Sequence, residues 1–314
     1  RILSKSGGIE QGSTVLVYGY PETGKTQIAE AFMAEAKDLI VMIDSEHTFR
    51  GTRFREICES RGKDPYEISK RLKYYHPDDW MEQEKVINSL EEFDEDGNFL
   101  KVGLVVVDSI MKHWSAAREW HGRDKMGRRA QMIRAELNDL ASYCRRHGAV
   151  LLLTSHVYET PDAKAFSSLE SIVHPPGGPT LLHFPDYVIF IKKFRDNVRT
   201  ARLVGSPDLP QQEIPFILDI SGIRDMPDPT ERMMAFEMTS KYGEKFLSGK
   251  VSQKGPSKED YKKALKSGFI SPEEAKEKGW LTDEEIEKIK IELEELRKKG
   301  TSIKEIYEEM KQLQ

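Results

Sequence analysis

Apolar residues along the chain fall in short continuous runs that alternate with stretches of helical periodicity. The runs predict strands at residues 14–18, 39–43, 102–107, 149–154, 187–191, 200–204 and 215–220. The periodic stretches predict helices at residues 27–37, 52–61, 80–93 and 127–147. Uninterrupted Val, Ile and Leu runs separated by helices are typical of an α/β fold with a mainly parallel central sheet flanked by helices.

The sequence changes character at about residue 250, where it becomes rich in Lys and Glu. Ser271 and Thr282 each begin a capping box, in which a Ser or Thr precedes a Glu by three residues at a helix start. Apolar residues then recur at helical spacing at Ile286, Ile289, Leu293 and Leu296. We therefore expect a core domain at residues 1–249 and a small helical C-terminal extension at residues 250–314.

The most specific motif lies between the first predicted strand and the first predicted helix. Residues 19–26, GYPETGKT, match the phosphate-binding loop pattern G-x-x-x-x-G-K-[ST] at every specified position. Such a loop turns backbone N–H groups and the positive end of a helix dipole toward a phosphate. A chance Gly-rich turn is the alternative, and the flanking strand and helix count against it. The expected nucleotide-binding residues are Gly19, Tyr20, Pro21, Glu22, Thr23, Gly24, Lys25, Thr26 and Gln27.

Side chains at this loop and at one strand end suit ATP with Mg²⁺. Lys25 can reach the β and γ phosphate oxygens and stabilise charge during catalysis, and Thr26 offers a hydroxyl to Mg²⁺. Asp108 follows the strand at residues 102–107, where a phosphate-loop enzyme holds its acidic group for the metal. We expect ATP and Mg²⁺ as cofactors, with Thr26 and Asp108 on the metal side.

Titratable residues follow two other predicted strands. Glu46 comes after residues 39–43, where a carboxylate can orient or deprotonate the water that attacks the γ-phosphate. A solvated loop residue or a helix cap is an equal alternative from position alone. His156 follows residues 149–154 and can sense the γ-phosphate, although a structural histidine is at least as common.

Cationic and aromatic residues gather just before the predicted helix at residues 127–147. Cations neutralise nucleic-acid phosphates, and rings such as Trp120 and His121 stack on unpaired bases. Because Glu119 and Asp124 are interspersed, a solvated basic surface is an equal alternative. The candidate DNA-binding residues are Arg118, Arg123, Lys125, Arg128 and Arg129.

Composition narrows the class of protein. A net charge of −5 argues against a protein that coats polyanions with its whole surface, so any nucleic-acid site must be local. No apolar run approaches the length of about eighteen residues that predicts a membrane span. The two cysteines, Cys58 and Cys144, lack metal-binding spacing, which favours a reducing, cytoplasmic compartment.

The order of these motifs resembles that of the RecA/RadA recombinase superfamily, and their sequences are most similar to those of archaeal RadA proteins and their eukaryotic counterparts. Residues 43–50, IDSEHTFR, are similar to the family segment D-T-E-x-T-F-R, and residues 107–109, VDS, resemble its Walker B strand. The resemblance covers about residues 1–225. It implies a RecA-like P-loop ATPase core in which Glu46 is the catalytic base and Arg53 stacks on adenine.

The chain also departs from the family pattern. The helical N-terminal domain and polymerisation motif of RadA-type proteins are not in this sequence. The Asn-Gln pair of the family is Ser155-His156 here, and an acidic residue of its ATP-cap segment is Gly205. The changes leave ATP binding intact and bear on strand exchange. A RadB-like paralogue or a virus- or plasmid-encoded recombinase therefore fits as well as a housekeeping recombinase.

The resemblance implies a function. It is that of a DNA-dependent ATPase that binds single-stranded DNA as a nucleotide-dependent homo-oligomer or filament, works in homologous recombination or repair, and is associated with the nucleoid. One alternative is a non-catalytic or weakly catalytic paralogue that regulates a recombinase partner. Another is a RecA-like ATPase with a role outside DNA. Hydrolysis and oligonucleotide-binding measurements separate the three.

Overall fold

A computed structural model describes residues 9–122, 124–159, 173–195, 197–207, 209, 212–225, 258, 262, 265, 272–277 and 279–298. The chain divides into two compact units, residues 1–163 with 170–225 and residues 164–169 with 226–314. Each unit is considered by itself. The domain boundary expected at residues 249 and 250 falls outside the described residues and stays a prediction.

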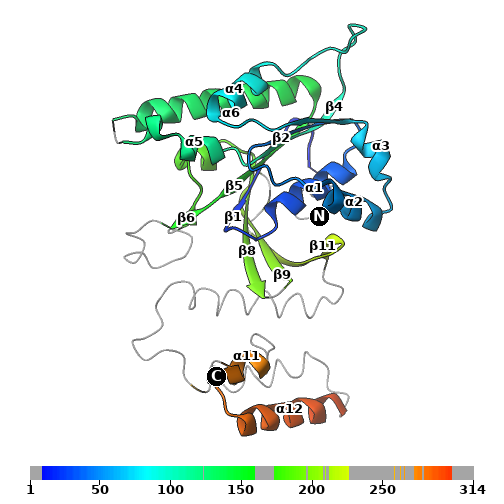
Figure 1. Ribbon diagram of the computed structural model, residues 1–314, viewed down its shortest axis with the longest axis vertical. Helices are drawn as coiled ribbons and strands as arrows, with labels where there is room; N and C mark the ends of the chain where they lie inside the picture. Colours follow the sequence, from blue (N-terminus) through cyan, green and yellow to red (C-terminus); the bar gives the residue numbers. More distant parts are fainter. Residues whose placement is uncertain are drawn as a thin grey trace. The chain divides into compact units, whose positions relative to one another are not determined.

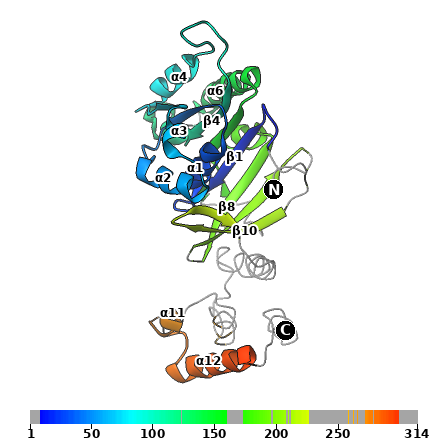
Figure 2. The same ribbon diagram turned by 90° about the vertical axis from the view of Figure 1, so that its right-hand side faces the viewer.

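The first unit is built on a nine-stranded sheet with the order β11-β10-β9-β8-β1-β5-β4-β2-β3 (Figures 1 and 2). Its strands are β1 (Thr14–Gly19), β2 (Leu39–Asp44), β3 (Leu72–Tyr75), β4 (Val102–Asp108), β5 (Val150–His156), β8 (Tyr187–Arg195), β9 (Val198–Gly205), β10 (Gln212–Asp219) and β11 (Gly222–Asp225). In this spatial order, the neighbouring strands from β8 through β1, β5, β4 and β2 to β3 pair parallel. The strands β9, β10 and β11 continue the sheet antiparallel. The predicted mainly parallel α/β sheet is confirmed.

Helices cover both faces of this sheet (Figure 1). They are α1 (Lys25–Glu35), α2 (Gly51–Ser60), α3 (Pro65–Ser69), α4 (Trp80–Asn88), α5 (Lys112–Ala116), the 3₁₀ turn η1 (Arg118–Trp120), α6 (Met126–His147) and α7 (Pro179–His183). Connections between parallel strands are right-handed, so helices whose connections run in opposite directions along the sheet lie on opposite faces. Accordingly α1, α2 and α3 lie on one face, and α4, α5 and α6 lie on the other.

The core follows from the alternation of side chains along the central strands. Alternate residues of a strand point to the same face, so one set of apolar side chains from each strand meets α1 and α2. This cluster of buried residues includes Val15, Val17, Ile28, Met33, Ile40, Met42, Phe54, Ile57, Leu104, Val106 and Leu152. Burial on both faces explains why these strands appear in the sequence as continuous apolar runs.

Some predicted elements differ from the structure. The strand β3 has no counterpart among the predictions, so β4 is the fourth strand along the chain and not the third. The sequence of β3, LKYY, forms an edge strand that is only partly buried, and it therefore lacks an apolar run. The helix expected at residues 80–93 ends at Asn88, and the strand expected at residues 215–220 spans Gln212–Asp219.

The described part of the second unit contains α11 (Pro272–Glu277) and α12 (Asp283–Lys298). Its apolar cluster consists of Leu265, Ala275, Leu281, Ile286 and Ile289. The predicted capping box at Thr282 is confirmed, because the Glu285 amide donates to Thr282 Oγ1 at 3.3 Å and the Thr282 amide donates to Glu285 Oε2 at 3.1 Å.

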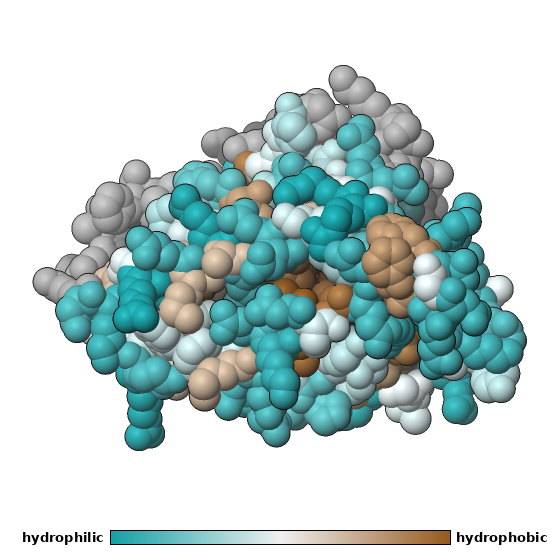
Figure 3. Space-filling view, turned by 90° about the horizontal axis from the view of Figure 1, so that it is seen from above, coloured by the Kyte–Doolittle hydropathy of each residue, from teal (hydrophilic) through white to brown (hydrophobic). Residues whose placement is uncertain are grey.

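The surface agrees with the charged composition. Figure 3 shows a face that is mainly hydrophilic, with small and separate hydrophobic areas. Among the helices in the described ranges, none combines the length and the apolar character that a membrane crossing requires.

One buried acid in the core provides a test of the packing. Glu30 on α1 is 1% exposed, and its Oε2 atom has no hydrogen-bond partner among the described residues. Burial raises the pKa of Glu30 from 4.5 to about 8, against the opposing charge of Arg53. A carboxyl group with a raised folded-state pKa holds its proton more tightly when folded, so its ionisation lowers stability as pH rises through this range.

We therefore expect Glu30→Met to stabilise the protein at about pH 9, by up to roughly 5 kcal/mol, and to change stability much less at about pH 5. Chemical denaturation of wild type and variant at both pH values measures this. The control is Glu35→Met, on the exposed side of the same helix. An equal effect of Glu30→Met at both pH values would contradict the assigned pKa shift.

Candidate nucleotide and DNA site

The phosphate-binding loop lies between β1 and α1, at the carboxyl ends of the parallel strands. Gly19 sits against the neighbouring strand, where a Cβ atom would lie 2.2 Å from the carbonyl oxygen of Ile191. Gly24 caps α1 with a φ of 94°, in the left-handed region that favours glycine. Within the loop, Glu22 also has a positive φ of 61°, and Thr23 Oγ1 donates to the Tyr20 carbonyl at 2.8 Å. Both glycines are required by the backbone geometry.

Lys25 is held inside this loop. Its Nζ atom donates to the carbonyl oxygens of Gly19 at 3.0 Å and Tyr20 at 2.9 Å. Burial lowers the pKa of Lys25 to about 8, although the negative charges of Asp108 and Glu46 act to raise it. A bound phosphate would favour the charged amine further, because opposite charge stabilises the protonated form.

Thr26 and Asp108 lie side by side beneath the loop. Thr26 Oγ1 donates to Asp108 Oδ2 at 2.7 Å, and Thr154 Oγ1 donates to Asp108 Oδ1. Burial raises the pKa of Asp108, while these two hydrogen bonds oppose that rise. A hydroxyl beside a carboxylate suits Mg²⁺, which takes few protein oxygens and completes its shell with phosphates and water. Within the described ranges, no group of three or more His, Cys, Asp or Glu residues could hold a metal ion.

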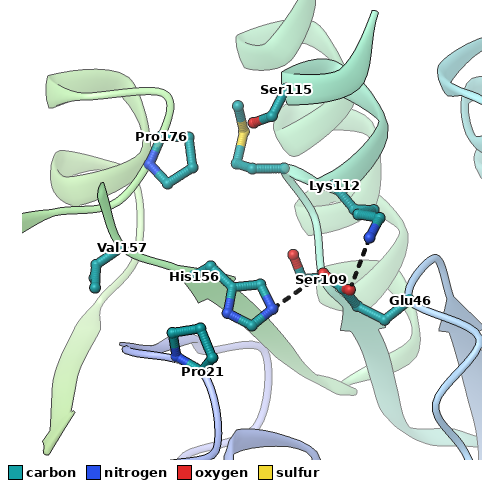
Figure 4. Close-up of a pocket in the computed structure, with 9 residues that line it drawn as sticks. Pro21, Glu46, Ser109, Lys112, Ser115, His156, Val157 and Pro176 are labelled. Carbon is teal, nitrogen blue, oxygen red and sulfur yellow. Dashed lines mark hydrogen bonds and ion pairs between the residues drawn. The ribbon is translucent and has the colours of Figure 1, made fainter. Parts of the chain in front are cut away.

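Glu46 lies just beyond β2, and its backbone amide donates to the Asp108 carbonyl at 3.1 Å. Its carboxylate contacts two side chains, with Oε1 3.3 Å from His156 Nε2 and Oε2 3.2 Å from Lys112 Nζ (Figure 4). Burial alone would raise the pKa of Glu46, but the contacts with His156 and Lys112 outweigh it and lower the pKa to about 2. Glu46 is therefore ionised at neutral pH.

His156 connects the phosphate-binding loop to Glu46. Its Nδ1 atom lies 3.3 Å from Lys25 Nζ, and its Nε2 atom faces the Glu46 carboxylate. An ammonium group only donates, so Nδ1 accepts from Lys25, and a neutral ring carries its proton on Nε2. His156 thus lies between the two expected catalytic residues, Lys25 and Glu46.

A cavity of about 250 Å³ opens beside these residues (Figure 4). It is bounded by the phosphate-binding loop, the turn after β4, the end of β5 and the segment before α7. The lining residues are Pro21, Glu46, Ser109, Met111, Lys112, Ser115, His156, Val157 and Pro176. The cavity thus lies at the sheet edge, between the phosphate-binding loop and the segments that follow β4 and β5.

Arg53 and Gln27 are also brought together. Arg53 Nη2 donates to Gln27 Oε1 at 2.6 Å, and Nη1 donates to Glu56 Oε2 at 2.8 Å. The same guanidinium donates to the carbonyl oxygens of Asp219 and Ile220. Arg53 therefore joins α1, α2 and the turn between β10 and β11, and its stacking on adenine stays a prediction.

The cationic residues of the candidate DNA-binding segment lie around η1 and the start of α6. Arg118 begins η1, Lys125 precedes α6, and both are exposed. The Arg128 guanidinium carbon lies 6.0 Å from the centre of the Trp120 ring. Arg129 is partly buried in the first turn of α6, and Arg123 lies outside the described residues. A cation above an indole ring offers both charge and a stacking surface.

The segment between β5 and α7 is described only at its two ends. The short strands β6 (Tyr158–Glu159) and β7 (Val173–His174) pair antiparallel, with Tyr158 opposite His174. Residues 160–172 lie outside the described residues.

Comparison with known proteins places this arrangement in a family. The family model Rad51 matches residues 2–226. The chain belongs to the Rad51 family. It is 30% identical over 228 residues to the DNA repair and recombination protein RadA of Metallosphaera sedula, an alignment that covers 70% of this chain and 68% of that protein. It is 29% identical over 228 residues to the protein of the same name from Aeropyrum pernix, which covers 70% of this chain and 69% of that relative.

Membership of the Rad51 family confirms the predicted resemblance. The family match ends one residue beyond β11, the last strand of the large sheet. The helices α11 and α12 lie beyond the matched residues, so the family says nothing about their role.

Two residues at this site were missed by sequence reasoning. Lys112 contacts Glu46 from α5, and Thr154 holds Asp108 from β5. Thr154 precedes a strand end that was already under consideration, so its position was a usable signal. Lys112 had no such signal, because a lysine in a short helix has no preferred partner along the sequence.

The close contact at Gly19 provides a test of the loop. We expect Gly19→Ala to lower stability by about 2 kcal/mol or more, because the new Cβ would force β1 and β8 apart. Thermal or chemical denaturation measures the loss. Gly51→Ala is the matched control, since no atom lies within 4 Å of the Cβ it would add. Equal stability of the two variants would count against the described strand spacing.

Proposed function

We propose that this chain is a DNA-dependent ATPase of the recombinase type that acts in homologous recombination or DNA repair. The convergence of Lys25, the Thr26–Asp108 pair and Glu46 at one edge of a parallel sheet carries the proposal. A phosphate-binding loop, oxygen ligands and an ionised carboxylate are the parts that phosphoryl transfer to water requires.

In this proposal each part has a defined task. The backbone N–H groups of the loop from Glu22 to Thr26 and the Lys25 amine bind the β and γ phosphates. Thr26 and Asp108 hold Mg²⁺, which neutralises phosphate charge when bound. Glu46 orients the attacking water. With a pKa of about 2 it is a weak proton acceptor, so orientation is the task that its electrostatics favour.

The partners follow from the family and from the cationic segment. The two relatives are named as DNA repair and recombination proteins, and we extend DNA binding to this chain. Arg118, Arg123, Lys125, Arg128 and Arg129 would contact phosphates of single-stranded DNA, with Trp120 as a stacking surface. We further propose a nucleotide-dependent homo-oligomer or filament associated with the nucleoid.

One observation favours a second candidate, a weakly catalytic paralogue that regulates a recombinase partner. The Glu46 carboxylate is already engaged by His156 and Lys112. A water molecule must compete with these side chains for the same oxygens. A protein in which they prevail would bind ATP and hydrolyse it slowly.

Glu46→Gln distinguishes these two functions. We expect ATP affinity within a few-fold of wild type and phosphate release reduced about 100-fold, because the amide cannot orient water as a carboxylate does. Phosphate release with and without single-stranded DNA is the measurement. The control is Glu67→Gln, an exposed carboxylate on α3 that pairs with Lys70. Unchanged slow hydrolysis in Glu46→Gln would instead support the regulatory paralogue.

Arg128→Ala tests the DNA segment. Each cation that neutralises a phosphate adds to the salt dependence of binding, so removal of one contact should weaken binding and reduce the log–log slope against salt by about 0.7 for single strands. Fluorescence anisotropy of a labelled oligonucleotide at several salt concentrations measures both. Arg55→Ala, which removes an exposed arginine on α2, should leave the slope unchanged. Wild-type binding and slope in Arg128→Ala would contradict a phosphate contact at Arg128, and absence of binding by the wild type would argue for a function outside DNA.

A further inference from the structure

A chain of buried hydrogen bonds runs behind the nucleotide site. Ser45 Oγ donates to Gln83 Oε1 at 2.6 Å, and Gln83 Nε2 donates to Glu136 Oε1 at 2.6 Å. Trp114 Nε1 donates to the other carboxylate oxygen, Oε2, of Glu136 at 2.5 Å. The four side chains come from the end of β2, from α4, from α6 and from α5, and each is at most 4% exposed.

Gln83 holds two functional turns at once. Its amide oxygen accepts from Ser45, the residue before Glu46, and its amide nitrogen also donates to the Ile110 carbonyl at 3.2 Å, just after Asp108. Both amide hydrogens and the amide oxygen are therefore in use. A shift of Gln83 would break at least one of these bonds, so the position of Gln83 and the positions of both turns depend on one another.

The buried carboxyl group of Glu136 is unfavourable for folding stability. Among the described residues it has no cationic partner, and only Gln83 and Trp114 donate to it. Burial raises the pKa of Glu136 to about 7, although these two hydrogen bonds oppose the rise. A buried carboxylate is weak support for stability. Because Glu136 accepts hydrogen bonds from Trp114 on α5 and Gln83 on α4, its role is better explained by the positioning of these two side chains.

Trp114, at the far end of this chain of hydrogen bonds, lies beside the candidate DNA-binding segment. The Trp114 ring is 5.0 Å from that of Trp80 and 6.0 Å from that of Trp120. Trp120 in turn lies beneath the Arg128 guanidinium, and Trp80 Nε1 donates to Glu119 Oε1 at 2.5 Å. A base or phosphate that moved Trp120 would press directly on Trp114.

The rings of Trp80, Trp114 and Trp120 form a tryptophan cluster. We propose that Gln83 and Glu136 are positioning residues that couple this tryptophan cluster to the Glu46 carboxylate. The inference rests on the proposed function. A ligand at Trp120 and Arg128 shifts Trp114, the hydrogen bond to Glu136 changes, and Gln83 passes the change to Ser45 and so to Glu46. Coupling between sites is reciprocal, so nucleotide at Glu46 must also change the surroundings of Trp114.

The first test compares stimulation by DNA with the basal rate. In Glu136→Gln one of the two donors would face an amide NH₂ and lose its acceptor. We expect the factor by which single-stranded DNA stimulates ATP hydrolysis to fall about tenfold, with the basal rate and ATP affinity within threefold of wild type. Asp139→Asn is the control, because it removes a carboxylate from the exposed side of the same helix. Full stimulation of Glu136→Gln would overturn the inference.

A second variant pair keeps the inference testable if Glu136→Gln does not fold. Ser45→Ala cuts the same chain at its other end, without altering the buried carboxylate, and should lose stimulation to the same extent. Ser45→Thr keeps the hydroxyl and should restore it. Equal behaviour of Ala and Thr at this position would contradict transmission through the Ser45 hydroxyl.

The reciprocal test needs no DNA. In a Trp280→Phe background, which removes the tryptophan of the second unit, a non-hydrolysable ATP analogue should change the fluorescence of the cluster at Trp114. The change should disappear in Glu136→Gln and Ser45→Ala and persist in Asp139→Asn. Persistence in all variants would reject the coupling. A wild type that shows this change but neither binds nor responds to DNA would reject the proposed function and retain the coupling.

Discussion

The site depends on the position of β4 between β2 and β5. In a parallel sheet the carboxyl ends of neighbouring strands meet at one edge, and here backbone hydrogen bonds extend that contact into the turns. The Glu46 amide donates to the Asp108 carbonyl at 3.1 Å, and the Ile110 amide donates to the Thr154 carbonyl at 3.1 Å. These bonds place the turns after β2 and β4 in register with β5, and the phosphate-binding loop follows from β1 on the far side of β5.

The electrostatics of this edge divide its two carboxylates. Burial raises the pKa of Asp108, whose carboxylate accepts hydrogen bonds from the hydroxyl groups of Thr154 and Thr26, so a cation beside it would stabilise its charged form. Glu46 has His156 and Lys112 as partners and a pKa of about 2. One acid is thus prepared to receive positive charge and the other already has it. The two carboxylates follow neighbouring strands and are suited to different tasks because their neighbours differ.

The family and the fold could be predicted because their signals are local. The glycines at 19 and 24, the lysine and the threonine appear together in eight residues, and the apolar runs that form β1, β2, β4 and β5 are continuous because both faces of these strands are buried. The edge strand β3 was missed because one partner strand and partial burial leave no such run. Element ends were also displaced, as for α4, because tertiary contacts decide where a helix stops.

The sequence by itself determined the strands buried on both faces, the phosphate-binding loop and the residues at the strand ends, since hydrophobic periodicity and backbone conformation act over a few residues. Only the tertiary structure decided the partners of those residues. Lys25 and His156 are 131 positions apart, and Glu46 and Lys112 are 66 apart. A hydrogen bond requires a donor–acceptor distance that is right to within a few tenths of an ångström and a suitable side-chain direction. A pKa depends in addition on burial. Neither these hydrogen bonds nor these pKa values can be predicted from the sequence alone, because both arise when distant segments pack together.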